Sequence, residues 1–188
     1  TGGIVPDQDW DRNKQKILRA IELTASIKLK YLTFHFGFID NTKPKLRERV
    51  KFLADAAGEK NVMILMETGQ EDAETLRDFL AELSHPALGV NFDPANMILY
   101  GKGDPVQALE TLAPWVKHVH IKDALRSPVA GEWGREVPWG EGDFDNNEFL
   151  STLSRIGYQG ALAIEREAGS TRMQDIQNTV GALQQFSV

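Results

Sequence analysis

The sequence predicts an α/β fold in which parallel strands alternate with helices, and within that class it favours a (β/α)8 barrel. Three observations lead to this prediction. Five short β-rich runs recur along the chain, a stretch with helical spacing follows each run, and polar residues stand at the carboxyl ends of the runs. Strands joined through helices run parallel, and barrels place their active sites at the carboxyl ends of their strands.

The β-rich runs are short and contain the β-branched, aromatic and aliphatic residues that favour strands. They are YLTFHF (31–36), VMILME (62–67), LGVNFD (88–93), VKHVHI (116–121) and ALAIER (161–166). Because a helical pattern follows each run, we expect five consecutive βα units.

Capping residues mark the starts of two expected helices. Asp104 and Pro105 form an N-cap and first-turn pair, and Asp145 with Glu148 resembles a capping box. Gly157 is placed to end the second of these helices. An opening helix is expected before the first strand. The apolar positions with helical spacing are Ile17, Leu18, Ile21, Leu46, Val50, Leu53, Ala57, Leu76, Phe79, Leu80, Leu83, Val106, Leu109, Leu112, Phe149, Leu150, Leu153, Ile156, Met173, Ile176, Val180 and Leu183.

The number of strands suggests an incomplete barrel. No GxGxxG or GxxxxGK(S/T) phosphate loop follows a strand, so the usual marker of a nucleotide-binding open sheet is missing. A (β/α)8 barrel usually needs about 250 residues, whereas this chain has 188 residues. We therefore expect one barrel domain over residues 1–188, with about the last five βα units present and the N-terminal strands missing. The opening TGGIVPDQDW is then a loop that follows a missing strand.

Composition limits the classes of function. A net charge of -6 and a pI near 5.3 argue against nucleic acid as a partner, because binding phosphodiester backbones requires a concentrated basic surface. The absence of cysteine excludes disulfides and thiolate metal ligands. No apolar run approaches the length of a membrane span and no signal-peptide pattern opens the chain, so we expect a cytoplasmic protein without a membrane partner. Homo-oligomerisation stays open.

Four strand-end residues predict a metal site. Glu67, Asp93, His120 and Glu165 each close a separate strand of the expected barrel. Three carboxylates and one imidazole that converge at the barrel mouth need a compensating cation. This oxygen-rich set suits Mn²⁺ or Mg²⁺ best, while Co²⁺ and Zn²⁺ stay open. A single acidic residue at a strand end is more often a helix cap or a solvated loop residue, so the recurrence on four strands supports the prediction.

Five motifs resemble those of a known family. They are VMILMETG, NFDPANMILYGKGDP, HVHIKDALR, VPWGEGDFD and GALAIERE. Together they resemble the xylose isomerase-like TIM barrels, namely the sugar phosphate isomerase/epimerase group with its ketose 3-epimerases. Inosose dehydratases and endonuclease IV-type enzymes are more distant members. The likeness runs from about the fourth family strand to the C-terminus, which is nearly the whole chain.

The resemblance implies roles for individual residues. It implies that one divalent metal is held by the four strand-end residues, and that Glu67 and Glu165 also form an acid/base pair on opposite faces of the sugar. Arg126 matches an arginine that contacts substrate oxygens in the epimerases. Asn96 stands where the epimerases usually carry histidine, so the branch and the substrate stay open. The substrate-binding candidates are His35, Asn96, Lys122 and Arg126.

Three neighbouring side chains share one face of the fourth run. His118, His120 and Lys122 point to the same side, because side chains alternate along a strand. His118 lies one layer deeper than His120, and we expect it to be a hydrogen-bonded interior histidine. Lys122 either binds a sugar hydroxyl or phosphate or pairs with a nearby carboxylate. His35 ends the first run and either contacts substrate or supports a metal ligand.

The long segment 127–145 (SPVAGEWGREVPWGEGDFD) lies between the fourth run and its helix. Loops of this length inside a compact domain are usually functional. Trp133 and Trp139 either form a rim that shelters the site from water or pack the segment down.

The expected function is that of a metal-dependent sugar or sugar-phosphate isomerase or epimerase. A metal that bridges a ketose carbonyl and its neighbouring hydroxyl stabilises an enediolate, and Glu67 or Glu165 removes the proton next to the carbonyl. A dehydratase of the inosose or dehydroshikimate kind is the first alternative. An endonuclease IV-like enzyme is disfavoured by the negative charge and by missing ligands for a multi-zinc cluster. A sugar-binding barrel without catalysis is a further alternative.

Overall fold

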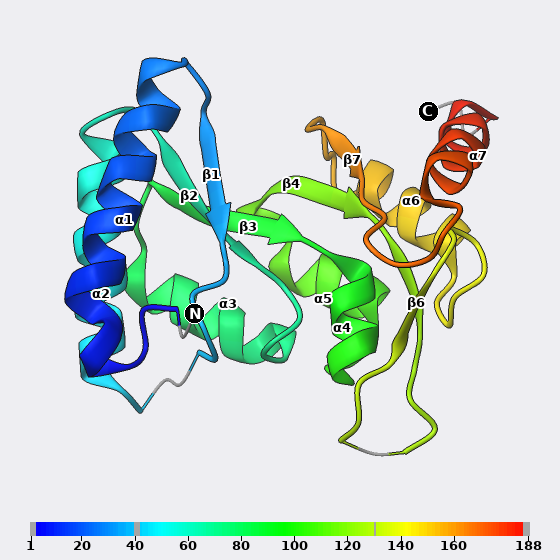
Figure 1. Cartoon of the computed structure of the whole chain (residues 1–188), viewed down its shortest axis with the longest axis horizontal. Helices are drawn as coiled ribbons and strands as arrows, with labels where there is room; N and C mark the ends of the chain where they lie inside the picture. Colours follow the sequence, from blue (N-terminus) through cyan, green and yellow to red (C-terminus); the bar gives the residue numbers. More distant parts are fainter. Residues whose placement is uncertain (1–2, 40–41, 130, 186–188) are drawn as a thin grey trace.

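A computed structural model of the chain describes residues 3–39, 42–129 and 131–185. Its centre is a sheet in which all neighbouring strands run parallel and follow one another in chain order (Figure 1). The strands are β1 (Tyr31–Phe34), β2 (Met63–Glu67), β3 (Leu88–Phe92), β4 (Val116–Ile121) and β7 (Leu162–Ile164). Among the described residues β1 pairs only with β2 and β7 only with β4, so the sheet is open. The predicted α/β class and the incomplete barrel of five parallel strands are confirmed.

Helices connect successive strands, as parallel pairing requires, and one further helix stands at each end of the series. They are α1 (Asp7–Ser26), α2 (Pro44–Gly58), α3 (Ala73–Leu83), α4 (Pro94–Tyr100), α5 (Pro105–Leu112), the short 3-10 helix η1 (Ala113–Trp115), α6 (Asn146–Arg155) and α7 (Arg172–Gln185). The carboxylates of Asp104 and Asp145 accept hydrogen bonds from backbone N–H groups in the first turns of α5 and α6, as predicted. Gly157 adopts a left-handed φ of 70° just after α6. None of the described helices has the length and apolar content needed to cross a membrane.

One apolar core joins the helices to the sheet. Phe79 of α3, Phe92 of β3 and Phe149 of α6 are fully buried in it, and the ring centroids of Phe92 and Phe149 lie 5.9 Å apart. Burying a side chain of this size contributes about 1.5–3 kcal/mol. β3 is buried at every position, whereas Leu162 of the edge strand β7 is 40% exposed. The sheet is therefore held most firmly at its centre.

Two features lie where the sequence predicts no element. α4 begins directly after β3, because Asp93 caps it and Pro94 occupies its first turn. β5 (Asp123–Leu125) and β6 (Arg135–Val137) form an antiparallel hairpin, of which β6 lies inside the segment predicted as a long loop. The hairpin packs against α4, and the two lie side by side at the carboxyl end of the sheet.

β4 contains one extra residue relative to β3. Asn91 pairs with His118, whereas the preceding residue of β3 pairs with Val116, so Lys117 has no partner position. A register shift of this kind is a β-bulge. It allows Val116 and Val119, three positions apart, both to lie in the apolar core. It also brings His118 level with Asn91.

Candidate metal centre

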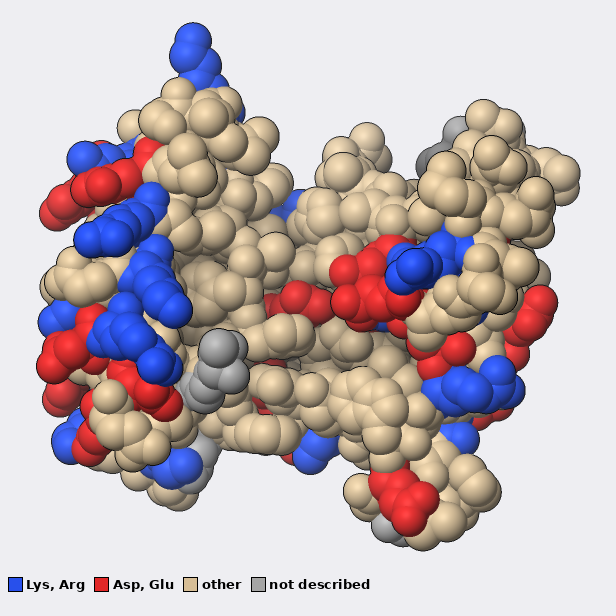
Figure 2. All heavy atoms as spheres, in the orientation of Figure 1, with Lys and Arg blue, Asp and Glu red and all other residues tan. Residues whose placement is uncertain are grey.

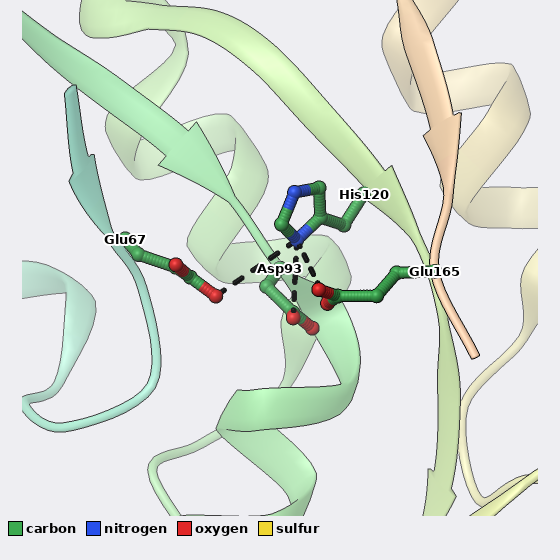
Figure 3. A group of neighbouring side chains, drawn as sticks. All are labelled: Glu67, Asp93, His120 and Glu165. Carbon is green, nitrogen blue, oxygen red and sulfur yellow. Dashed lines mark hydrogen bonds and ion pairs between the residues drawn. The ribbon is translucent and has the colours of Figure 1, made fainter. Parts of the chain in front are cut away.

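The carboxyl ends of the strands converge on a cluster of charged side chains. Figure 2 shows acidic side chains exposed in the middle of one face of the molecule, between the two ends of the sheet. Glu67 ends β2, Asp93 follows β3, His120 lies in β4 and Glu165 follows β7. One ligand atom from each of these residues lies within 4.8 Å of the others (Figure 3). The fold thus brings together four residues that are far apart in the sequence.

The imidazole of His120 lies among the three carboxylates. Its Nδ1 atom is 3.2 Å from Oε2 of Glu165, 3.4 Å from Oδ2 of Asp93 and 3.8 Å from Oε1 of Glu67. Figure 3 shows the three carboxylates approaching this one nitrogen from different strands. Nδ1, and not Nε2, is therefore the nitrogen that belongs to the cluster.

Asp93 is the most firmly held member of the cluster, with a side chain that is 0% exposed. Its Oδ1 accepts a hydrogen bond from the backbone N–H of Asn96 (2.9 Å) at the start of α4. The hydroxyl of Thr68 accepts from the N–H of Asp93 (2.8 Å) and donates to its carbonyl oxygen (3.0 Å). These contacts leave Oδ2 free to face His120, so the helix cap also fixes the ligand.

Burial and neighbouring charges displace the pKa values of the two glutamates in opposite directions. Burial raises the pKa of Glu67, and the charges of Asp93 and Glu165 raise it further. A hydrogen bond with His120, followed by one from Lys122, lowers the pKa of Glu165 to about 2. Although burial opposes the change, hydrogen bonds to Asp93 and Glu165 raise the pKa of His120 to about 10. Glu165 is therefore the more easily ionised of the two glutamates.

Lys122 adds a buried positive charge to the cluster, since its side chain is 3% exposed. Its Nζ donates to Oε2 of Glu165 (2.9 Å) and Oε2 of Glu167 (2.8 Å), and it lies 3.6 Å from Oδ2 of Asp93. Burial opposes ionisation, but these carboxylates hold the pKa of Lys122 above its usual value. Of the two roles predicted for Lys122, pairing with carboxylates is confirmed.

The donor set fits a divalent cation. Nδ1 of His120 and one oxygen from each of three carboxylates face one small space, and Asp93 is fixed there by contacts outside the cluster. Mutual repulsion among the carboxylates disfavours this arrangement unless positive charge compensates it. Oxygen donors with one imidazole suit Mn²⁺ or Mg²⁺, and Co²⁺ or Zn²⁺ are also accepted by such a set.

A pocket of ≈ 470 Å³ opens beside the cluster. Three of the predicted substrate-binding residues, His35, Asn96 and Lys122, line it together with Glu67 and Glu165. Nδ2 of Asn96 donates to Oε1 of Glu67 (3.0 Å), and Nε2 of His35 lies 3.9 Å from Oε2 of Glu67. Small-molecule sites typically measure about 300–1,000 Å³, so the pocket has room for a small ligand.

The two tryptophans of the segment 127–145 have different roles. Trp133 lines the pocket beside Tyr100 of α4, with ring centroids 4.4 Å apart, and it is 57% exposed. Trp139 packs edge-to-face against Phe149 in the core. Packing of the segment is therefore confirmed at Trp139, while shelter of the site from water by Trp133 stays a prediction.

Arg126 is not brought into the pocket. It is exposed and is absent from the pocket lining within the described part of the chain. Its backbone N–H donates to Oδ2 of Asp143 (2.6 Å), which holds the start of the long segment. A role for Arg126 in substrate binding stays a prediction.

Two polar residues beside the cluster were not predicted as part of the site. Asn91 of β3 is 0% exposed, and its amide lies between Nδ1 of His118 (2.8 Å) and Nε2 of His120 (3.2 Å). His118 thereby makes the interior hydrogen bond expected of it. An asparagine two residues before Asp93 in an apolar strand was the signal, because alternation places both on one face. Glu167, the partner of Lys122, lies two residues beyond the last ligand.

A parallel α/β sheet with a carboxylate-rich candidate cation site at the carboxyl ends of its strands is typical of the barrel proteins that place their active sites at that end. The sequence profile of one family within that class, the xylose isomerase-like TIM barrel family, matches residues 2–186. The chain belongs to this family.

Solved structures share the fold. A xylose isomerase domain protein from Planctomyces limnophilus superposes with a TM-score of 0.90 at 34% identity, covering 98% of this chain and 67% of that one. A xylose isomerase-like TIM barrel protein from Mycobacterium smegmatis, solved in complex with magnesium, has a TM-score of 0.77 at 21% identity, covering 97% of this chain and 69% of that one. The second likeness shows the fold alone.

Characterised relatives belong to two reaction classes. An inosose dehydratase from Clostridium tetani is 26% identical over 162 residues, which are 77% of this chain and 54% of that protein. A ketose 3-epimerase from Arthrobacter globiformis is 27% identical over 103 residues, which are 55% of this chain and 32% of that protein. The chain spans about half the length of the first of these relatives and a third of the second. Its relatives are enzymes, and they do not share one activity.

Proposed function

We propose that the protein containing this chain is a metal-dependent enzyme that isomerises or epimerises a sugar by moving a proton next to its carbonyl group. The observation that supports the proposal most strongly is the pair of glutamates. Glu67 and Glu165 stand on either side of Asp93 and His120, and their pKa values are displaced in opposite directions. Two carboxyl groups with separated pKa values at one site are a typical acid/base pair.

The proposed roles take the two glutamates as groups in different surroundings, Glu67 more buried and Glu165 paired with His120 and Lys122. Glu165, ionised at neutral pH and kept so by Lys122, takes the proton from the carbon next to the carbonyl, and the electron pair of that C–H bond moves toward the carbonyl. Glu67, which keeps its proton to higher pH, donates that proton to the opposite face of the same carbon, and this inverts the carbon. Delivery of a proton to the former carbonyl carbon instead, with the neighbouring hydroxyl proton passing to the former carbonyl oxygen, gives aldose–ketose isomerisation. The bound cation supplies Lewis acidity that polarises the carbonyl. His35 and Asn96 are proposed to bind sugar hydroxyls.

Charge in the pocket is compatible with both an uncharged sugar and a sugar phosphate as substrate, because a divalent cation would balance the excess of carboxylates. The carboxylates that line the pocket outnumber its cations, and Lys122 already pairs with two of them. The lining charges are Glu67, Glu136, Glu165 and Glu167 against Lys122 and Arg135. Arg135 is exposed, so sugar phosphates are included in the test below. The proposal takes Mn²⁺ or Mg²⁺ as the cation and the cytoplasm as the location.

A dehydratase is the second candidate, because an inosose dehydratase is among the relatives and Asn96 leaves that reaction open. The family's epimerases usually carry histidine at this position, whereas here the amide of Asn96 donates to Glu67. In this alternative Glu165 removes the same carbon-bound proton, and a hydroxyl leaves from the next carbon. Glu67 protonates that hydroxyl, so that it departs as water.

Proton NMR in deuterated water tests both candidates. Candidate ketoses, their phosphates, an inosose and 3-dehydroshikimate are incubated with the full-length protein and Mg²⁺, which is diamagnetic, and then without it. Wild type is compared with Glu165→Gln, Glu67→Gln and the matched surface control Glu59→Gln. The proposal expects metal-dependent deuterium incorporation next to the carbonyl, abolished by the first two variants and unchanged in the third.

Three outcomes separate the candidates. Deuterium in a recovered sugar or its epimer supports the isomerase or epimerase. An unsaturated product that has lost water identifies a dehydratase. Binding of the sugars with no exchange of carbon-bound protons would contradict both and leave a sugar-binding barrel.

A further inference from the structure

The inference concerns Asn91, whose side chain contacts both histidines of β4. Its Oδ1 lies 2.8 Å from Nδ1 of His118 and its Nδ2 lies 3.2 Å from Nε2 of His120. Its Nδ2 is also 3.4 Å from the hydroxyl of Thr33 on β1. We propose that Asn91 is a positioning residue, whose amide fixes the ring nitrogen of His120 that is available to the cation. The inference rests on the cation site and not on the proposed reaction.

The position of the hydrogen on the imidazole of His120 decides which ring nitrogen is available to the cation. A neutral imidazole carries one N–H, and a nitrogen that binds a metal carries none. Because Nδ1 of His120 faces the three carboxylates, a cation there requires the hydrogen to be on Nε2. A buried N–H needs an acceptor, and ligand histidines generally donate this second N–H to a fixed oxygen. Asn91 is the residue in contact with Nε2.

The orientation of the Asn91 amide decides which of its two polar atoms faces each ring. As placed, Nδ2 of Asn91 faces Nε2 of His120, which suits only a ring whose Nε2 has no hydrogen, whereas both the cation-bound ring and the doubly protonated ring carry a hydrogen there. Half a turn about the Cβ–Cγ bond exchanges the two amide atoms, so that Oδ1 accepts from Nε2–H of His120. Nδ2 then donates to Nδ1 of His118, and the hydroxyl of Thr33 can donate to the amide oxygen. Every polar group keeps a partner in both orientations, so the rotation leaves no buried group unpaired.

The amide couples the tautomers of the two imidazoles, because one amide cannot present its oxygen to both rings at once. Occupation of the cation site therefore places the hydrogen of His118 on its Nε2 atom. An aspartate at position 91 accepts from both rings and favours the metal-ready tautomer, whereas a leucine accepts from neither.

Metal titration provides the first test. Mn²⁺ affinity is measured from the electron paramagnetic resonance signal of the free ion for wild type, Asn91→Leu, Asn91→Asp and the exposed control Asn178→Leu. We expect about 10- to 100-fold weaker binding in Asn91→Leu, affinity equal to or tighter than wild type in Asn91→Asp, and no change in the control. Wild-type affinity in Asn91→Leu would overturn the inference. So would equal losses in the leucine and aspartate variants, because packing rather than an acceptor would then explain both.

Long-range ¹H–¹⁵N NMR on the wild-type protein with Mg²⁺ provides a second test that does not depend on how the position-91 variants pack. His120 is assigned by comparison with His120→Asn. We expect the hydrogen of His120 on Nε2 and that of His118 also on Nε2 in the loaded protein. Coordination through Nε2 of His120, or a hydrogen on Nδ1 of His118, would contradict the inference. Neither test depends on turnover, so an inactive protein that passes both would refute only the proposed function.

Discussion

Raising the pH should destabilise the cation-free protein through His120. The folded-state pKa of His120 is raised from 6.5 to about 10, so its stabilising effect is fully present below about pH 6.5 and is lost as the pH rises toward 10. At about 1.4 kcal/mol per pKa unit, the shift corresponds to roughly 5 kcal/mol at most. Its ion-pair partner Glu165 is 32% exposed, and solvent screening reduces the attraction. We therefore expect a loss of about 2 kcal/mol.

Urea unfolding between pH 6 and pH 10 measures this loss. His120→Asn has no titrating group at position 120, so the difference between the two profiles isolates the effect from other groups that titrate in this range. A saturating divalent cation should remove most of the difference, because Nδ1 then binds the cation in place of a proton. Parallel profiles for wild type and variant without cation would refute the assigned electrostatics of the cluster.

The remaining predictions concern three buried charges. Burial raises the pKa of Glu71 to about 7, so its stabilising contribution is present below about pH 4.5 and lost as the pH rises through 7. Glu71→Gln should gain about 2 kcal/mol at pH 8 in urea unfolding, and equal stability would contradict this. Lys122→Met should lower the free energy of unfolding of the cation-free protein by about 3 kcal/mol. It should also tighten Mn²⁺ binding, because Nζ no longer competes for Glu165, and weaker Mn²⁺ binding would contradict this competition. Asp123, 1% exposed, accepts from the N–H of Gly140 (2.8 Å), so Asp123→Ala should cost about 3 kcal/mol and speed hydrogen exchange at Gly140. Unchanged exchange would rule out this role.

The sequence was sufficient to predict the sheet and the convergence of the four candidate ligands, because both follow from local pattern and chain direction. Short β-rich runs alternating with helical spacing imply parallel strands, and parallel strands bring their carboxyl ends to one side. A polar residue at each of those ends is then near the others, which is how Glu67, Asp93, His120 and Glu165 come together. The exact length of β7 was overestimated, since the strand ends at Ile164 and Glu165 directly follows it, with its N–H still bonded to the carbonyl oxygen of Ile121.

Features that depend on tertiary context were not predictable. The β5–β6 hairpin forms because the segment is held against α4, and its glycine-rich sequence has no strand pattern of its own. The opposite pKa shifts of Glu67 and Glu165 depend on burial and on the contacts of Glu165 with His120 and then Lys122, none of which a sequence reveals. Arg126 matched a family position by spacing alone, yet its side chain does not line the pocket in the described part of the chain.

The extra residue in β4 divides that strand into two segments whose side-chain phases are independent. Before the extra residue, Val116 points into the core. After it, His118 and His120 point to the face of the sheet that carries the site. Deleting Lys117 should leave a regular ladder with both imidazoles still facing inward. Deleting Val119 should reverse one ring toward the helices, since a strand has only two sides. Substitutions that change how the first part of β4 packs in the core can therefore leave His118 and His120 in place.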